Sequence, residues 1–156
     1  MPKVNEFLIV DIECPEIKML QVVAAALSDG NGRVLVQCRP ETGSMPGLWE
    51  FPGGKLESGE TPEAGLCREL VEELGIVVDE RALTPLGFAS APLNDRHLVM
   101  LLFAASEWQG LPSPLHATAI QWVTPEQLSA LPMPPADAPL IPLIAQLLSI
   151  RSETAG

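Results

Sequence analysis

The sequence predicts an α+β fold in which layers of helices and strands pack against one another. Apolar runs of strand length alternate along the chain with two or three segments of helical pattern. Turn signals between neighbouring apolar runs indicate antiparallel hairpins. At 156 residues the chain is long enough for one domain with a substantial core. We expect that domain over residues 19–151, after an N-terminal arm (1–18) and before a short tail (152–156).

The first predicted hairpin turns at residues 29–32, which read Asp-Gly-Asn-Gly. Residues 19–28 are rich in Val, Ala and Leu and fit a buried strand, and residues 33–38 are predicted to return as its antiparallel partner. Within the arm, residues 7–10 have the composition of a further short strand.

Glycine and proline dominate the next segment. Residues 40–48 are typical of a loop, and residues 49–51 of a short strand that leads into Pro52-Gly53-Gly54. Because they lack a Cβ, Gly53 and Gly54 allow a ligand or metal ion to approach the backbone closely.

A helix is predicted over residues 62–74. Thr61 is a good N-cap, and Pro62 at the first helical position lacks only a donor that would have no partner there. Glu63 places a negative charge where the helix dipole favours one, and Gly75 can end the helix in the left-handed conformation.

This helix has two distinct faces. At about 100° per residue, an apolar stripe forms and a group of acids falls on the opposite side. The stripe consists of Cys67, Leu70, Val71 and Leu74, and the acids are Glu69, Glu72 and Glu73. Like charges at these spacings repel one another, whereas a divalent cation such as Mg²⁺ binds carboxylate oxygens together with phosphates and water. The acids therefore form either a solvated face or a cation site.

Two more strands are predicted after the helix, over residues 86–91 and 98–105, around a turn at residues 92–96. His97 opens the second of these strands. We interpret His97 as a packed or hydrogen-bonded side chain rather than a ligand.

The C-terminal part begins with a Pro-rich loop at residues 110–119 and the last predicted strand at residues 120–123. Residues 124–127, Thr-Pro-Glu-Gln, fit a capping box for a short helix. Asp137 is predicted to cap a final helix. The apolar stripe of that helix is Leu140, Leu143, Ile144, Leu147 and Leu148.

The charge balance limits the choice of partners. Acidic residues number 20 against 9 basic ones, which gives a net charge of −11. Such a surface repels phosphate backbones, so a nucleic-acid duplex is not an expected partner. A small anionic substrate is compatible with this surface if metal ions neutralise the negative charges where the substrate contacts the protein.

The cysteines and apolar runs indicate a cytoplasmic protein. The three cysteines, Cys14, Cys38 and Cys67, are odd in number and show no C-x-x-C spacing, which indicates reduced thiols. The longest apolar run, near residues 22–27, is far too short to span a bilayer, and the N-terminus has no signal pattern. We therefore expect an unexported protein with no membrane partner. No pattern indicates an oligomeric state.

The acidic helix lies within a longer motif, G-x5-E-x7-R-E-U-x-E-E-x-G-U, where U is a bulky aliphatic residue. The matching residues are Gly54, Glu60, Arg68, Glu69, Leu70, Glu72, Glu73, Gly75 and Ile76. Seven strict identities at average residue usage give a chance frequency of roughly 10⁻⁸ per frame. The motif resembles a complete Nudix box, which favours a cation site over a solvated acidic face.

Further residues resemble the MutT-like branch of the Nudix family, so that the resemblance covers about residues 22–147. They are Arg39, residues 48–55 (LWEFPGGK), Asp95-Arg96-His97, Trp122 and residues 134–137. The resemblance implies an α/β/α sandwich around a mixed sheet, with the box as a loop-helix-loop. It also implies a Mg²⁺-dependent enzyme, with Mn²⁺ as a substitute, that takes a small-molecule nucleotide. The expected reaction converts ordinary or oxidised (deoxy)nucleoside triphosphates, such as 8-oxo-dGTP, to the monophosphate and pyrophosphate, a DNA-repair activity that sanitises the nucleotide pool.

The resemblance also implies roles for residues of the box. The expected metal ligands are the Gly53 carbonyl, Glu69, Glu72 and Glu73. Arg68 is expected to orient Glu69, and Glu60 to hold the loop or to help position Arg68. The expected catalytic set is Glu69, Glu72, Arg68 and Glu60.

Outside the box, the resemblance implies contacts to the substrate. Arg39 is expected to contact phosphate, and Lys55 is either a second phosphate contact or a solvated charge. The other expected substrate-binding residues are Glu50, Phe51, Asp95, Arg96 and Asp137, the last four at positions where MutT-like enzymes enclose and read the base.

Two positions depart from the MutT-like pattern. These enzymes often carry a glutamate in the loop before the Trp122 strand, but here the loop has no acid and His116 lies at the corresponding place. His116 is either a neutral ligand or proton acceptor in place of that glutamate or, as we favour because Mg²⁺ prefers oxygen, a bystander. The general base stays open, with Glu69 as the first candidate. Asp137 stands where some of these enzymes have asparagine, and an ionised aspartate only accepts hydrogen bonds unless burial keeps it protonated.

Several functions stay open on the sequence alone. Within the family, the alternatives are a CTP or dCTP pyrophosphohydrolase and an ADP-ribose hydrolase. Outside the enzymes, the alternative is a non-catalytic Nudix-like ligand sensor. The complete set of Arg68, Glu69, Glu72 and Glu73 argues against a sensor, which has no need for all four.

Overall fold

Strand β1 (Lys18–Leu27) lies at the centre of the fold and pairs on both sides. A computed structural model describes residues 16–154, with side chains to residue 150. Along its whole length β1 runs parallel to β6 (Arg96–Ala105), and its other edge takes β4 (Gly53–Lys55) in antiparallel register. The antiparallel strand β5 (Thr84–Leu93) completes a four-stranded mixed sheet in the order β4-β1-β6-β5.

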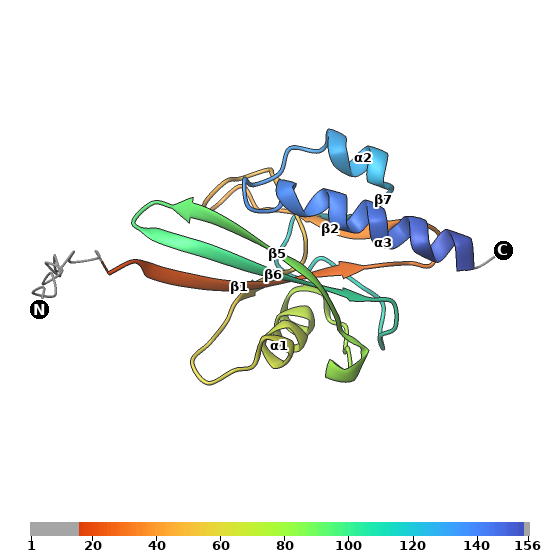
Figure 1. Cartoon of the computed structure of the whole chain (residues 1–156), viewed down its shortest axis with the longest axis horizontal. Helices are drawn as coiled ribbons and strands as arrows, with labels where there is room; N and C mark the ends of the chain where they lie inside the picture. The colour runs from red at the N-terminus through yellow and green to blue at the C-terminus, as the bar shows by residue number, and fades with distance from the viewer. Residues whose placement is uncertain (1–15, 155–156) are drawn as a thin grey trace, which may run out of the picture.

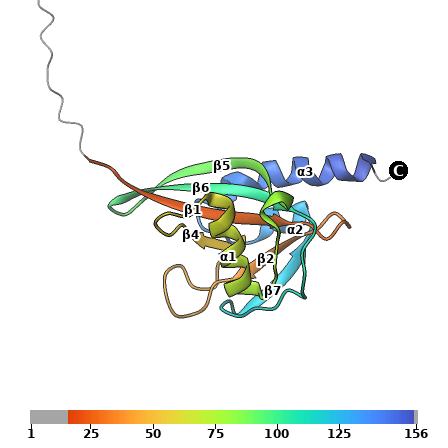
Figure 2. The same cartoon turned by 90° about the horizontal axis from the view of Figure 1, so that it is seen from below.

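A second sheet is built from three short strands. Strand β2 (Val34–Cys38) lies between β3 (Trp49–Glu50) and β7 (Ala119–Val123), and both neighbours are antiparallel to it. The strands of both sheets are seen in Figure 2, with β2 and β7 beside the longer strands.

The predicted pairing of residues 19–28 with residues 33–38 is wrong. The turn forms, because Asp29 Oδ1 accepts hydrogen bonds from the backbone N–H groups of Asn31 and Arg33. Beyond it, however, only Ser28 and Val34 form an isolated bridge. The reason is that both edges of β1 are taken by β4 and β6, so β2 enters the other sheet.

Helices cover the strands from two sides. Helix α1 (Pro62–Leu74) lies on one side, and α2 (Pro125–Ala130) and α3 (Ile141–Thr154) lie on the other (Figure 1). Two 3-10 turns, η1 (Glu80–Ala82) and η2 (Ala138–Leu140), join elements at the edges. The predicted α+β class is therefore confirmed.

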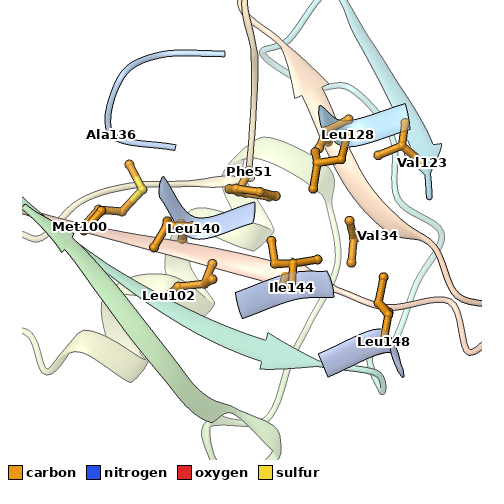
Figure 3. Packing of buried hydrophobic residues seen from close by; sticks show 14 of the residues in the cluster. Val34, Phe51, Met100, Leu102, Val123, Leu128, Ala136, Leu140, Ile144 and Leu148 are labelled. Carbon is orange, nitrogen blue, oxygen red and sulfur yellow. The ribbon is translucent and has the colours of Figure 1, made fainter. Parts of the chain in front are cut away.

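Alternating residues of the central strands point to opposite faces of the sheet and belong to two separate hydrophobic cores. On the α1 side, Val23, Ala25 and Leu27 pack with the buried leucines of α1. On the α3 side, Ala24 and Ala26 belong to a second cluster, which Figure 3 shows. Its labelled members are Val34, Phe51, Met100, Leu102, Val123, Leu128, Ala136, Leu140, Ile144 and Leu148.

The predicted bounds of α1 are confirmed, and its predicted apolar stripe is correct at Leu70 and Leu74 but wrong at Val71. Thr61 Oγ1 accepts from the N–H of Ala64, and Gly75 ends the helix with φ 69°. The buried residues are Gly65, Leu66, Leu70 and Leu74, whereas Val71 is 47% exposed and Cys67 is only half-buried. Positions 66, 70 and 74 meet the sheet because successive residues four apart lie on one line along a helix.

The hairpin after α1 is longer than predicted on both strands. It turns at Asn94, whose φ is 53°, and Asp95. His97 Nε2 lies 2.6 Å from Ser90 Oγ across the hairpin, in agreement with its interpretation as a hydrogen-bonded histidine.

The capping box of α2 is confirmed, with both hydrogen bonds between Thr124 and Gln127 present. The predicted cap at Asp137 is wrong, because its side chain makes no cap hydrogen bond and instead accepts from the N–H of Phe51. The stripe of the last helix is confirmed. Leu140, Ile144 and Leu148 are buried, and Leu143 and Leu147 pack against the same cluster.

Two further predictions concern the ends of the chain. The strand predicted at residues 7–10 lies outside the described residues, and the domain limits 19–151 stay a prediction. Within the part of the chain that the structure describes, no helix is long and apolar enough to cross a membrane.

Candidate active site

Gly53 and Gly54 bring the backbone of β4 against its neighbours. A Cβ on Gly53, whose φ is 150°, would overlap the carbonyl oxygen of Val23. A Cβ on Gly54 would lie 2.5 Å from the carboxyl carbon of Glu69. Position 53 therefore requires glycine, and glycine at position 54 lets the Glu69 carboxylate of α1 rest directly on β4.

Glu73 is the most buried acid of the box. Its Oε2 accepts hydrogen bonds from Gln37 Nε2 and from the N–H of Gly53, each at 2.9 Å. Burial, together with the negative charges of Glu69 and Glu50, raises the pKa of Glu73 to about 7 against the lowering effect of those hydrogen bonds. The site thus holds a carboxylate in surroundings that disfavour its charge.

Arg68 connects the acids of the box. Its Nε and Nη2 form a fork with the two oxygens of Glu60, at 2.6 and 3.0 Å. Its Nη1 donates to Glu69 Oε1 at 2.9 Å and to Glu72 at 3.3 Å. Hydrogen bonding to Arg68 lowers the pKa of Glu60 to about 2, and the same pairing holds the pKa of Arg68 above its ordinary value. Arg68 therefore joins Glu60 of the loop to Glu69 of the helix.

The acids form an open group rather than a closed cage. Among residues 16–154, no three His, Cys, Asp or Glu side chains are arranged closely enough to hold a metal ion by themselves. A hard cation such as Mg²⁺ usually takes one or two carboxylates and completes its shell with water and substrate phosphates. Glu69 and Glu73, beside the bare backbone of Gly53 and Gly54, fit that donor set, and the side chain of Glu72 is 49% exposed next to them.

A cavity of about 670 Å³ adjoins this group. Its lining contains Gly53, Gly54 and Glu73 of the box, and Leu20, Val22, Leu98 and Met100 supply an apolar wall. The predicted substrate-binding residues Arg39, Glu50, Phe51, Lys55, Asp95, Arg96 and Asp137 all line it. Glu60, Arg68, Glu69 and Glu72 are not part of the lining and lie in the box beside it.

Arg39 and Glu50 form an ion pair within the lining. Arg39 Nη1 lies 2.6 Å from Glu50 Oε2, and its Nε and Nη2 donate to the carbonyl and hydroxyl oxygens of Ser44. Burial raises the pKa of Glu50, against the lowering effect of Arg39. The pair ties the 40–48 loop to strand β3.

Asp137 and Phe51 line the cavity from its α3 side. Asp137 is 2% exposed, and its Oδ1 accepts from the N–H of Phe51 at 3.2 Å. Burial raises the pKa of Asp137 to about 7. The phenyl ring of Phe51 is 3% exposed and packs in the core of Figure 3, so only a small part of it faces the cavity.

The remaining candidates lie at the tip of a hairpin and in a loop. Asp95 and Arg96 are exposed at the tip of the β5–β6 hairpin. His116 is exposed in the 111–119 loop, which meets the end of α1 through a hydrogen bond from the N–H of Leu115 to the carbonyl of Glu73.

Sequence reasoning missed two features of the site. The apolar wall consists of alternate residues of two strands, Leu20 and Val22 of β1 and Leu98 and Met100 of β6. Alternation within each strand does not predict this wall, because the wall forms only where β1 pairs with β6. Gln37 was also missed, although a single polar residue in the apolar run Val34–Cys38 was a signal.

Known proteins with similar sequences and structures were found. The family model described as "NUDIX domain" matches residues 18–144. An "8-oxo-dGTP diphosphatase" of Escherichia coli (strain K12) is 32% identical over 84% of this chain and 100% of its own length. A "CTP pyrophosphohydrolase" of the same organism is 34% identical over 86% of this chain and 98% of its own.

Among solved structures, the "Solution structure of the E. coli ORF135 protein" superposes with a TM-score of 0.76 and 32% identity. The match covers 86% of this chain and 94% of that one. Since the family model spans most of the chain and carries the box whose side chains meet at β4 and α1, the protein belongs to the NUDIX family and is a MutT-like Nudix hydrolase.

Proposed function

We propose that the protein is a Mg²⁺-dependent nucleoside triphosphate pyrophosphohydrolase. It converts an ordinary or oxidised (deoxy)nucleoside triphosphate, such as 8-oxo-dGTP, and one water to the nucleoside monophosphate and pyrophosphate. The observation that carries this proposal is a single cavity lined both by Glu73 with Gly53 and Gly54 and by the buried Asp137. A cavity of about 670 Å³ has the size of a small-ligand site. The names of the two relatives support the same class of substrate.

Glu69, Glu73 and the backbone at Gly53 would hold the cation, with Glu72 as a more exposed ligand. Burial disfavours the charged form of Glu73, and a cation beside it would restore that form. Bound Mg²⁺ would supply neutralisation of the phosphate charge and a more acidic water.

Glu69 is the proposed general base. Arg68 donates to its Oε1 and fixes the carboxylate against Gly54, so that Oε2 can accept a proton from the attacking water. The side chain of Glu69 is 14% exposed, which limits the orientations that it can adopt.

Asp137 is the proposed reader of the base. With a pKa of about 7, it is present near neutral pH both as an acceptor-only carboxylate and as an acid that also donates. Since Oδ1 already accepts from Phe51, its other oxygen is the one available to a base in the cavity.

A second candidate substrate is CTP or dCTP. It is supported by the relative named as a CTP pyrophosphohydrolase, which is 34% identical over nearly all of its length. The carboxylate form of Asp137 would suit the exocyclic amino group of cytosine, which is a donor.

A turnover screen tests the proposal. Purified protein with Mg²⁺ is offered 8-oxo-dGTP, dGTP, CTP, dCTP and ADP-ribose, and pyrophosphate and monophosphates are quantified. We expect pyrophosphate from at least one triphosphate and none after chelation of the metal. Two monophosphates from ADP-ribose, with no pyrophosphate from any triphosphate, would contradict the proposal.

The variant Glu69→Gln tests the role of the base. We expect kcat to fall by at least about 100-fold, because the amide cannot accept the proton. Glu63→Gln on the same helix is the matched control and should keep nearly full activity. Near-normal turnover of Glu69→Gln would remove Glu69 from the mechanism.

A further inference from the structure

Gln37 is a buried polar residue next to Glu73, an acid that lines the cavity. It lies in β2 after Val34, Leu35 and Val36, which are fully buried apolar side chains, and it is itself 3% exposed. Leu35 and Gln37 share one face of the strand because side chains alternate. Leu35 packs in the cluster of α1, so that face points toward the box helix.

The carboxamide of Gln37 meets two acids. Its Nε2 donates to Glu73 Oε2 at 2.9 Å. Glu50 lies directly opposite Gln37 on β3, where the side chain of Gln37 works against the rise in the pKa of the Glu50 carboxyl. A carboxamide nitrogen has two hydrogens, enough for one bond to each acid. The reverse orientation would point the amide oxygen at two negative charges.

This arrangement leaves Gln37 Oε1 buried without a hydrogen-bond partner among the side chains that the structure describes. An unpaired buried acceptor costs free energy, whereas a leucine or methionine at the same position would fill the strand without that cost. Stability alone therefore favours an apolar residue at position 37. The glutamine fits a role in the site better than a role in the core.

We propose that Gln37 is a positioning residue for the metal-binding acid. By holding Glu73 Oε2 together with the N–H of Gly53, it would leave Glu73 Oε1 available to a cation. Gln37 also lies opposite Glu50, which pairs with Arg39 on the substrate side of the cavity. The inference rests on the proposed function, since only there is Glu73 a metal ligand.

The test uses binding of Mn²⁺ alone, without nucleotide, to the full-length protein. Free Mn²⁺ is followed by its electron paramagnetic resonance signal for the wild type and for Gln37→Met and Gln37→Leu. We expect the Kd for Mn²⁺ to rise at least about tenfold in both variants, as is usual when a partner of a metal ligand is lost. Their thermal unfolding midpoints should be equal to or above that of the wild type.

The control is Gln121→Leu, the same change at an exposed position of the neighbouring strand β7. Its Kd should stay within about twofold of the wild-type value, below the tenfold effect expected for a lost partner. Wild-type affinity in Gln37→Met, or failure of both Gln37 variants to fold, would overturn the role of Gln37 while the proposed function stands. Absence of Mn²⁺ binding to the wild type would overturn both proposals.

Discussion

Gly54 decides how closely the Glu69 carboxylate approaches strand β4. We predict that Gly54→Ala lowers kcat at least about tenfold, since the new Cβ would lie 2.5 Å from the carboxyl carbon and must displace it. The cost in stability should be small, about 1 kcal/mol, because the displaced group is the end of a side chain. Steady-state kinetics and urea unfolding measure the two effects.

Gly87→Ala is the control for this variant. Its Cβ would lie 2.6 Å from Leu143 Cδ1, another flexible side-chain end, but far from the acids of the box. Turnover should be unchanged there. Equal turnover in both alanine variants would show that the fit of Glu69 against β4 is not needed.

At this scale, the sequence identified residues that form a spaced motif and missed those that act singly. Glu69, Glu73 and Arg68 were found because their spacing is informative, and the structure places them together at β4 and α1. Gln37 belongs to no motif. Its importance depends on Glu50 and Glu73, which only the folded chain brings to it.

At the scale of elements, the orientation of α1 about its axis determines which acids reach the site. We predict that Leu70→Ala lowers the free energy of unfolding by about 2–5 kcal/mol, because Leu70 is fully buried. Val71→Ala should change it by less than about 0.5 kcal/mol, because Val71 is 47% exposed and alanine is the better helix former. Urea denaturation of the two variants separates these values. An equal decrease in the free energy of unfolding of both variants would mean that Val71 is part of the buried stripe, as the sequence predicted.

Elements whose limits depend on local chemistry were predictable. Helix α1 begins at Thr61 and ends at Gly75 for reasons contained in those residues, and the capping box of α2 is equally local. The partner of β2 was not predictable in this way, since a turn reverses the chain but leaves open which sheet the strand joins. Asp137 failed as a cap for a similar reason, because its partner Phe51 is distant in sequence.

At the scale of the whole molecule, burial of Asp137 makes stability depend on pH. Folding raises its pKa from 3.8 to about 7, so the folded state binds this proton more tightly than the unfolded state. Its contribution to stability is therefore complete below about pH 4 and is lost as the pH rises toward 7.

The variant Asp137→Asn keeps an oxygen for the N–H of Phe51 and removes the titration. We predict that its free energy of unfolding, relative to wild type, is about 2 kcal/mol higher at pH 8.5 than at pH 5.5. Chemical denaturation at the two pH values measures this difference. The same relative stability at both would mean that Asp137 keeps its ordinary pKa in the folded protein.

The overall architecture was predictable mainly through the resemblance. Apolar runs and helical patterns predicted the α+β class, and the resemblance to the Nudix family predicted a mixed sheet between helices. The division into a four-stranded and a three-stranded sheet was not foreseen, because it depends on which strands occupy the two edges of β1.

The parallel pairing of β1 with β6 joins Lys18 to Arg96 and Leu27 to Ala105. A chain emerging from the ribosome at about 5–20 residues per second therefore exposes its first strand for roughly 4–16 seconds before the matching strand has been made. During that interval the edge of β1 that pairs with β6 has no native partner, so a chaperone that binds exposed strand edges would act on the nascent chain before residue 105 leaves the exit tunnel.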